Sequence, residues 1–185
     1  MAVQAQRKLF TVDDYYKMAE VGILAPEDRV ELIHGEIIKM SPIKSFHSSM
    51  VDHLHEMLLL LLHGKAIIKG QNPIRIDDYS EPEPDLTIAK FQAHKYRHQH
   101  PRPEDVHFLI EVADTTLQKD RKIKLPLYAE AGIPEVWIVN LKNNSVEVYT
   151  NPLDGAYQEL NTLKVGEVLH FESLGLELEL ERVFG

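Results

Sequence analysis

Two acidic residues stand where apolar strands are expected to begin or end. Asp85 closes the Pro-rich run of "SEPEPDLTIAK", just before an apolar Leu-Thr-Ile, and Glu111 lies at the end of the apolar run "HFLIEVA". A carboxylate in such a place is costly unless it has a partner or a metal ion. Singly, Asp85 could end a turn and Glu111 could pair with a lysine. Together, on consecutive strands, they can converge at one sheet edge and indicate a site.

The helix expected after Glu111 offers a third group. Asp120, Lys124 and Tyr128 recur every four residues and therefore share one helical stripe. Lys124 could then reach the space between Asp85 and Glu111. The alternative is an ordinary surface ion pair between Asp120 and Lys124. The neighbouring apolar stripe is expected to pack on the sheet and consists of Ile123, Leu127 and Ala131.

Hydrophobic periodicity and turn residues predict the elements that must position these groups. Helices are expected over 11–22, 45–64 and 116–133, and Pro126 should either kink the last helix or mark a late start. Hairpins are expected over 29–42 and 135–150, and strands over 66–77, 84–89, 106–113 and 175–184. This order predicts one α/β domain over residues 1–185: a mixed α+β sheet flanked by helices.

Composition narrows the classes of function. The chain has 185 residues, no cysteine and a formal net charge of −9. The lack of cysteine excludes thiolate chemistry and disulfides and fits a reducing cytoplasm. The longest apolar run, "MLLLLLH" at 57–63, is too short for a membrane span and predicts a buried helix end. We therefore expect no membrane association.

A net charge of −9 repels nucleic acid, but the charge is uneven, because residues 90–124 hold eight of the 20 Lys and Arg residues. The segment "KFQAHKYRHQHPR" at 90–102 mixes cations with two aromatic residues, and such a loop can touch phosphates and stack on a base. A solvated loop is the alternative. The candidate nucleic-acid contacts are Lys90, Lys95, Arg97 and Lys122.

These residues carry a resemblance. The chain resembles the PD-(D/E)xK nuclease superfamily and, within it, the putative restriction endonuclease domain family of bacteria. The matching pieces are "ELIHGEIIKMSP", His47 at the start of a long helix, "QNPIRIDDYSEPEPDLTI", "IEVADTTLQKDRKIKLPLYAEAGIPEVWIVN" and "GEVLHF". The resemblance implies a restriction-endonuclease-like core. Ala113 occupies the place of the superfamily lysine two residues after Glu111. In the narrower family the lysine lies in the following helix, which makes Lys124 the candidate and Lys122 the alternative.

The resemblance also implies a mechanism. Asp85 and Glu111 would hold Mg²⁺, or Mn²⁺ as a substitute, with the backbone carbonyl of Val112 and with Glu31 as further ligands. The metal would polarise the scissile phosphate and activate a bound water. Lys124 would orient that water or stabilise charge on the phosphoryl oxygens. Possible supporting residues are His47, Gln71, Asp120 and Tyr128.

The expected function is that of a metal-dependent DNA endonuclease in the bacterial cytoplasm. A homodimer is expected, because two cuts on opposite strands require two sites, and either the "LELELE" tail or the "EVWIVN" hairpin could supply the contacting edge. The rival function is a non-catalytic nucleic-acid-binding or assembly protein that keeps the nuclease fold, which the net charge of −9 favours.

Overall fold

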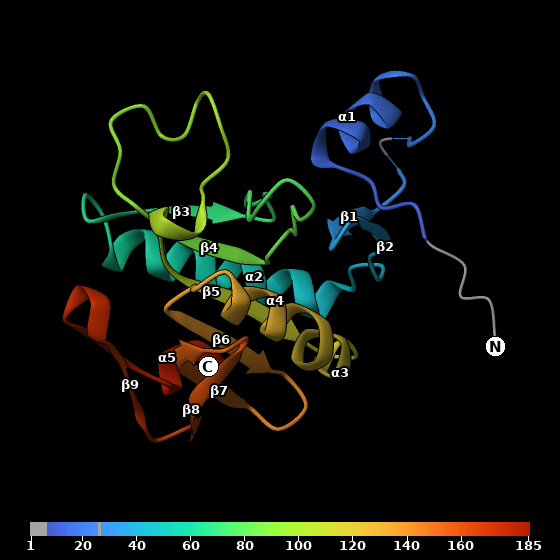
Figure 1. The fold of residues 1–185 in the computed structure, drawn as a ribbon. Helices are drawn as coiled ribbons and strands as arrows, with labels where there is room; N and C mark the ends of the chain where they lie inside the picture. The colour runs from blue at the N-terminus through green and yellow to red at the C-terminus, as the bar shows by residue number, and fades with distance from the viewer. Residues whose placement is uncertain (1–6, 26) are drawn as a thin grey trace.

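A six-stranded mixed sheet runs through the centre of the computed structural model, which describes residues 7–25 and 27–185. Its strands lie in the order β3 (Ala66–Gly70), β4 (Leu86–Lys90), β5 (Val106–Ala113), β6 (Glu135–Asn140), β7 (Ser145–Leu153) and β8 (Ala156–Lys164). Neighbours are antiparallel except β5 and β6, which are parallel. The expected mixed sheet flanked by helices is confirmed (Figure 1).

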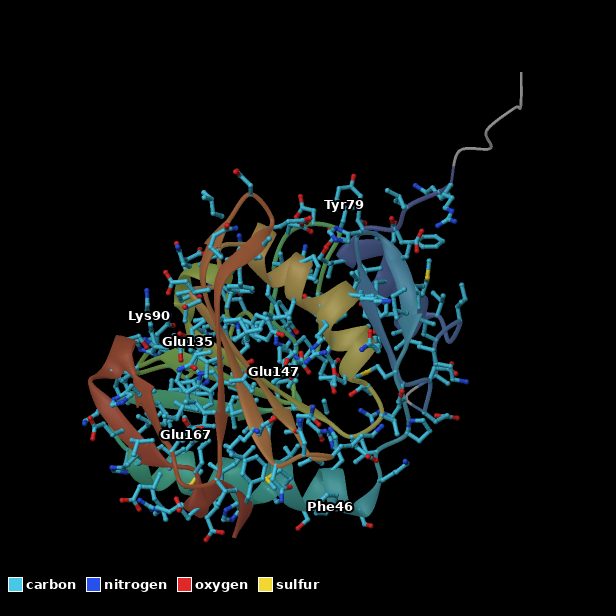
Figure 2. All side chains as sticks on the ribbon, turned by 90° about the horizontal axis from the view of Figure 1, so that it is seen from below. Phe46, Tyr79, Lys90, Glu135, Glu147 and Glu167 are labelled. Carbon is cyan, nitrogen blue, oxygen red and sulfur yellow. The ribbon has the colours of Figure 1, made fainter. Side chains whose placement is uncertain are left out.

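The other elements surround this sheet. The helices are α1 (Val12–Glu20), α2 (Ser45–Leu61), α3 (Leu117–Lys119), α4 (Leu125–Glu130) and α5 (Glu181–Phe184). Two hairpins stand apart from the main sheet and are β1 (Val30–Ile33) with β2 (Glu36–Lys39), and β9 (Val168–Phe171) with β10 (Leu176–Glu179). Short helical turns are η1 (Pro103–Asp105), η2 (Asp120–Lys124) and η3 (Glu172–Leu174). Figure 2 shows the helix ending in α4 and the helix α2 on different sides of the β7–β8 hairpin.

Alternation along β5 determines which way Glu111 points. Successive side chains of a strand face opposite sides of the sheet. Phe108 packs in the core under α2, where its ring stacks on Trp137 at a centroid distance of 4.2 Å. Leu109 packs on the other face with Tyr128 of α4. Glu111 is two residues beyond Leu109, so it also lies on the α4 face.

The helix expected over 116–133 has an irregular middle. It runs through α3, η2 and α4, and η2 is a π-helical turn directly before Pro126. Proline lacks a backbone N–H, and its ring collides with the carbonyl four residues earlier, so the wider π-helical turn relieves the collision. The α-helix α4 begins at Leu125 with Pro126 in its first turn, so of the two predictions for Pro126 the late start is found. The turn rotates Ile123 outward to 37% exposure while Lys124 is buried. The expectation that Ile123 packs on the sheet is therefore wrong.

Several strand predictions need correction. The strand expected over 66–77 ends at Gly70, because Gln71 adopts a left-handed φ of 48° and Pro73 follows. The tail expected as one strand over 175–184 divides into β10 and α5. Strands β8 and β9 were not expected at all. The "EVWIVN" segment forms β6, which is internal to the sheet and not an edge.

The apolar run at 57–63 is only partly buried. Leu58 and Leu62 are 0% and 1% exposed, whereas Leu59 and Leu60 are 50% and 75% exposed. A helix on a sheet buries one stripe of residues three or four apart, so the expectation of a buried helix end holds for one face of the helix only. No helix in the described residues is both long and apolar enough to cross a membrane.

The β1–β2 hairpin turns at His34 and Gly35, as the His-Gly pair predicts, and both have positive φ, 49° and 73°. This hairpin carries Glu31 toward the sheet. A Cβ added at Gly35 would lie 2.7 Å from Leu9 Cβ and 3.1 Å from the Phe10 carbonyl oxygen. Gly35 is therefore needed for its φ and for the close approach of the segment before α1.

We expect Gly35→Ala to destabilise the protein by about 1–3 kcal/mol more than Gly22→Ala, because overpacking adds to the backbone strain. Gly22 is the matched control: its φ is also positive, 77°, but no atom lies within 4 Å of an added Cβ. Urea unfolding measures both free energies. Equal losses for the two variants would show that residues 9–10 do not pack on the hairpin turn in solution.

Candidate active site

Asp85 is held by donors from three segments. It lies just before β4, and its Oδ2 accepts the Val112 backbone N–H at 2.8 Å and lies 3.1 Å from His47 Nε2. Gln71 Nε2 donates to Oδ1 at 3.4 Å. Burial acts to raise the pKa of Asp85, but the bonds from His47 and Val112 outweigh it and hold that pKa below its usual value. Asp85 is therefore an ionised carboxylate with a fixed orientation.

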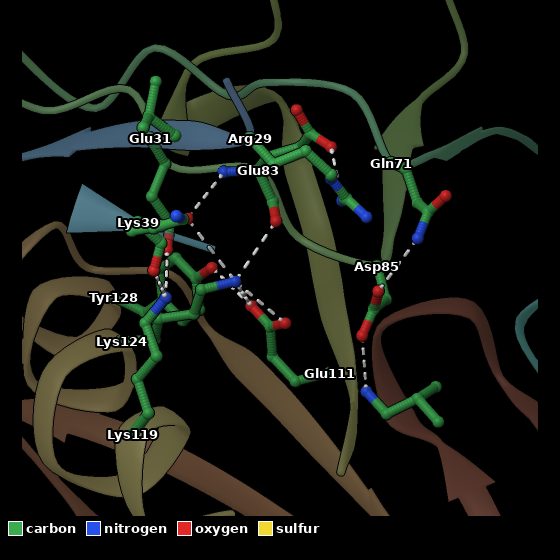
Figure 3. A network of polar contacts seen from close by, with 12 residues as sticks. Arg29, Glu31, Lys39, Gln71, Glu83, Asp85, Glu111, Lys119, Lys124 and Tyr128 are labelled. Carbon is green, nitrogen blue, oxygen red and sulfur yellow. Dashed lines mark hydrogen bonds and ion pairs between the residues drawn. The ribbon is translucent and has the colours of Figure 1, made fainter. Parts of the chain in front are cut away.

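Glu111 is paired with a buried ammonium. Lys124 Nζ donates to both carboxylate oxygens, at 3.0 and 3.1 Å, and Tyr128 donates its hydroxyl to Oε1 at 2.6 Å (Figure 3). Burial raises the pKa of Glu111 to about 8, and the positive charge of Lys124 opposes this rise. Glu83 contributes its backbone carbonyl, which accepts from Lys124 at 3.1 Å. Tyr128 thus fixes the carboxylate of the pair, and the Glu83 carbonyl fixes its ammonium.

Glu31 joins the same network from β1. Its Oε1 accepts from Lys119 Nζ at 2.9 Å, its Oε2 accepts the Glu83 backbone N–H at 3.2 Å, and Lys124 Nζ lies 3.6 Å from Oε2. Burial acts to raise the pKa of Glu31, but the charges of Lys124 and Lys119 lower it below its usual value. Figure 3 shows Lys124 between Glu31 and Glu111.

These side chains line a cleft of about 70 Å³. One water needs roughly 10–15 Å³ of such space, so the cleft has room for a few waters or a partly hydrated ion. Its acidic lining residues are Glu31, Glu83, Asp85, Glu111, Asp114 and Asp120, and its basic ones are Arg29, Lys44, Lys119 and Lys124, with His47 beside them. Carboxylates therefore outnumber the cations in the cleft.

The donor set of the cleft fits a hard divalent cation. Within the described part of the chain, no three His, Asp or Glu side chains form a ready cage for a metal. Mg²⁺ does not require one, since it binds through one or two carboxylates and keeps several waters. Asp85 and Glu111 offer two carboxylates from neighbouring strands. The buried Oδ2 of Asp120 has no hydrogen-bond partner among the described residues, and burial raises the Asp120 pKa.

The structure brings together most of the residues selected from the sequence. In or against the cleft lie Glu31, His47, Gln71, Asp85, Glu111, Asp120, Lys124 and Tyr128. Val112 contributes its backbone N–H to Asp85. The buried Lys124 reaches Glu111, whereas Lys122 is exposed and does not line the cleft.

The basic loop at 90–102 does not line the cleft. Lys90 ends β4, and Lys95 and Arg97 follow it, all three exposed. Asp85 stands at the opposite end of that strand, roughly 17 Å away at the usual rise of a strand. Any contact of this loop with nucleic acid would therefore lie away from the carboxylates.

Sequence reasoning missed part of the cleft, namely Arg29, Lys44, Glu83, Asp114 and Lys119. One signal was available: Glu83 and Asp85 flank Pro84, which keeps the segment extended, so the two acids share a side. Lys119 had no comparable signal, because it joins Lys124 in the cleft through the π-helical turn.

The mixed sheet flanked by helices is the fold of a restriction-endonuclease-like protein. The family model of Uma2, described as a putative restriction endonuclease, matches residues 12–181, and the chain belongs to this family. The structure is similar to the crystal structure of a putative nuclease belonging to DUF820 from Anabaena variabilis. That match has 16% identity and a TM-score of 0.74, and it covers 95% of this chain and 97% of the other. No curated protein matches the chain.

The raised pKa of Glu111 predicts a pH-dependent stability. In the metal-free protein its carboxyl has a pKa of about 8 against 4.5 for an ordinary Glu, so between these values the folded state binds the extra proton. Stability is then lost as pH rises through this window. Relative to wild type, Glu111→Gln should gain up to about 1.4 kcal/mol per pH unit there.

Chemical unfolding of both proteins in a chelator, across that pH range, measures this difference. Glu104→Gln serves as the control, because Glu104 is exposed. A constant difference between wild type and Glu111→Gln would mean that Glu111 is ionised throughout and that Lys124 overrides its burial.

Proposed function

We propose that this protein is a Mg²⁺-dependent endonuclease that hydrolyses phosphodiester bonds of DNA, with Mn²⁺ as a substitute metal. The observation that carries the proposal is the convergence of Asp85 and Glu111, from neighbouring strands, in a cleft with the buried ammonium of Lys124. Membership of the putative restriction endonuclease family supports the same reaction class.

Asp85 and Glu111 would hold the metal, with Glu31 and the Val112 carbonyl as further ligands. A bound Mg²⁺ supplies Lewis-acid polarisation of the phosphate and a lower pKa for a coordinated water. The His47 and Val112 bonds keep Asp85 ionised and aimed at the cleft.

Lys124 would serve the phosphoryl group. Burial acts to lower its pKa, but the charges of Glu111 and Glu31 raise it above the usual value, so the ammonium keeps its proton. A fixed cation in a water-poor cleft stabilises charge that develops on phosphoryl oxygens and can orient the attacking water. Tyr128 fixes the position of the Glu111 carboxylate beside Lys124 through the 2.6 Å hydrogen bond.

Contacts to the rest of the substrate would come from exposed cations. Lys90, Lys95, Arg97 and Lys122 are exposed, and lysine and arginine on a surface attract the phosphate backbone. We place the protein in the bacterial cytoplasm, acting on DNA as a homodimer.

A non-catalytic binding or assembly protein remains the second candidate. The observation in its favour is that Lys124 already satisfies both oxygens of Glu111, and a net charge of −9 opposes tight DNA binding. Metal binding separates the two candidates, since a scaffold has no need of a metal in this cleft.

Cleavage is tested with supercoiled plasmid and single-stranded DNA in Mg²⁺ or Mn²⁺ at low salt. Wild type should cut, and Asp85→Asn, Glu111→Gln and Lys124→Met should each lose roughly 10²-fold or more of the rate. Lys122→Met is the matched control, an exposed lysine two residues from Lys124, and should lose far less. If Lys124→Met cuts normally and Lys122→Met does not, the lysine assignment is wrong.

Metal binding is tested without activity. Mg²⁺ or Mn²⁺ should raise the melting temperature of the wild type, with about 2.7 kcal/mol of stabilisation at a hundredfold excess over Kd. Asp85→Asn should lose most of this shift, because it removes one of the two principal ligands. Absence of any metal-induced shift in the wild type, with no cleavage, would favour the binding-protein function.

A further inference from the structure

The outer edge of β8 is an open end of the main sheet. β8 is the last strand in the sheet order, and within residues 7–25 and 27–185 no strand pairs with its outer side. Edge strands are usually blocked by proline, bulges or several charges. The stretch from Gln158 to Leu163 has no proline and one charged residue, Glu159. This edge is therefore unprotected.

The edge is also held rigid. The two-residue turn Asp154–Gly155 has φ values of 50° and 75°, the left-handed geometry of a tight hairpin. Tyr157 donates its hydroxyl to the Ile133 carbonyl at 2.8 Å and ties β8 to the body of the protein. Counting alternately from the turn, residues 157, 159, 161 and 163 direct their backbone groups outward. A rigid row of outward donors and acceptors needs little ordering to bind another strand.

We propose that β8 pairs antiparallel with β8 of a second copy of this chain, about a two-fold axis at Leu160. Full overlap of the nine residues puts Leu160, 56% exposed, opposite itself. The same register puts Glu159 opposite Asn161 and Gln158 opposite Thr162, so no like charges face each other. The sequence of β8 is complementary to itself in this register, and the paired edges form one continuous twelve-stranded sheet.

The two-fold axis has a consequence for the candidate sites. Leu160 pairs with Tyr149, which packs on the α4 face of the sheet, the face that carries Glu111. An axis perpendicular to the sheet leaves both α4 faces on one side. The two β5 strands are then seven strand spacings apart, about 34 Å along the sheet, which is close to one turn of B-DNA at about 34–36 Å. This arrangement of two sites depends on the proposed function, whereas the interface does not.

The test is a charge change on the axis. Leu160→Lys apposes two ammonium groups and should turn a dimer of twice the 21.2 kDa chain mass into a monomer in sedimentation velocity. Leu160→Glu should do the same, and an equimolar mixture of the two variants should restore the dimer. That rescue requires self-contact at position 160 and cannot come from a misfolded variant. Leu60→Lys is the matched control, since Leu60 is 75% exposed on α2.

Three results would overturn the interface: a monomeric wild type at high micromolar concentration, a Leu160→Lys dimer, or no rescue in the mixture. Dissociation by Leu60→Lys alone would place the contact on α2, where Leu59 and Leu60 are exposed. Plasmid cleavage separates the two proposals. A monomeric Leu160→Lys that nicks one strand but makes few double-strand breaks supports both. A dimer that never cuts DNA keeps the interface and refutes the nuclease.

Discussion

The rest of the cleft depends on the buried contact between Glu111 and Lys124, which is an ion pair above the Glu111 pKa of about 8. Both side chains are almost wholly buried, at 4% and 6% exposure, and each ion removed from water costs several kcal/mol. Such a pair is tolerated only when its remaining hydrogen-bond capacity is filled. Tyr128 and the Glu83 carbonyl fill it, at 2.6 and 3.1 Å. Three segments contribute a group to this contact: the helix supplies Lys124, the segment before β4 supplies the Glu83 carbonyl, and β5 supplies Glu111.

Five carboxyl groups of the cleft fall into two kinds, which differ in the direction of their pKa shift. Asp85 and Glu31 have donors enough to keep their pKa values low, whereas burial raises those of Glu83, Glu111 and Asp120. Environments that separate the pKa values of neighbouring acids are typical of sites where charge changes during function. Burial is the main cause of the raised pKa of Glu111, and the charges of Asp120 and Asp85 add to it. A divalent cation beside Asp85 and Glu111 would oppose this rise.

Sequence patterns predicted the structure correctly in segments that follow one regular helical or strand period. The places of Asp85 and Glu111 at the ends of consecutive strands were enough to predict that they meet at one sheet edge, and the i, i+4 spacing linked Lys124 to Tyr128. The pattern failed where geometry departs from a single period. The π-helical turn carried Ile123 outward and Lys119 inward. The mostly polar β8, with all its residues exposed or half-exposed, offered no apolar alternation that would reveal a strand.

The lysine could not stand where the wider superfamily pattern would put it. Ala113, two residues after Glu111, is fully buried in the core between β5 and α4, where a lysine stem has no room. Lys124 instead reaches Glu111 from the helix that packs on this face of the sheet, and the π-helical turn sets the direction of its side chain. Loss of one residue in that turn would rotate everything before Lys124 by about 100°. Lys119 would then leave Glu31, and the cleft would keep its carboxylates while losing one of the charges that balance them.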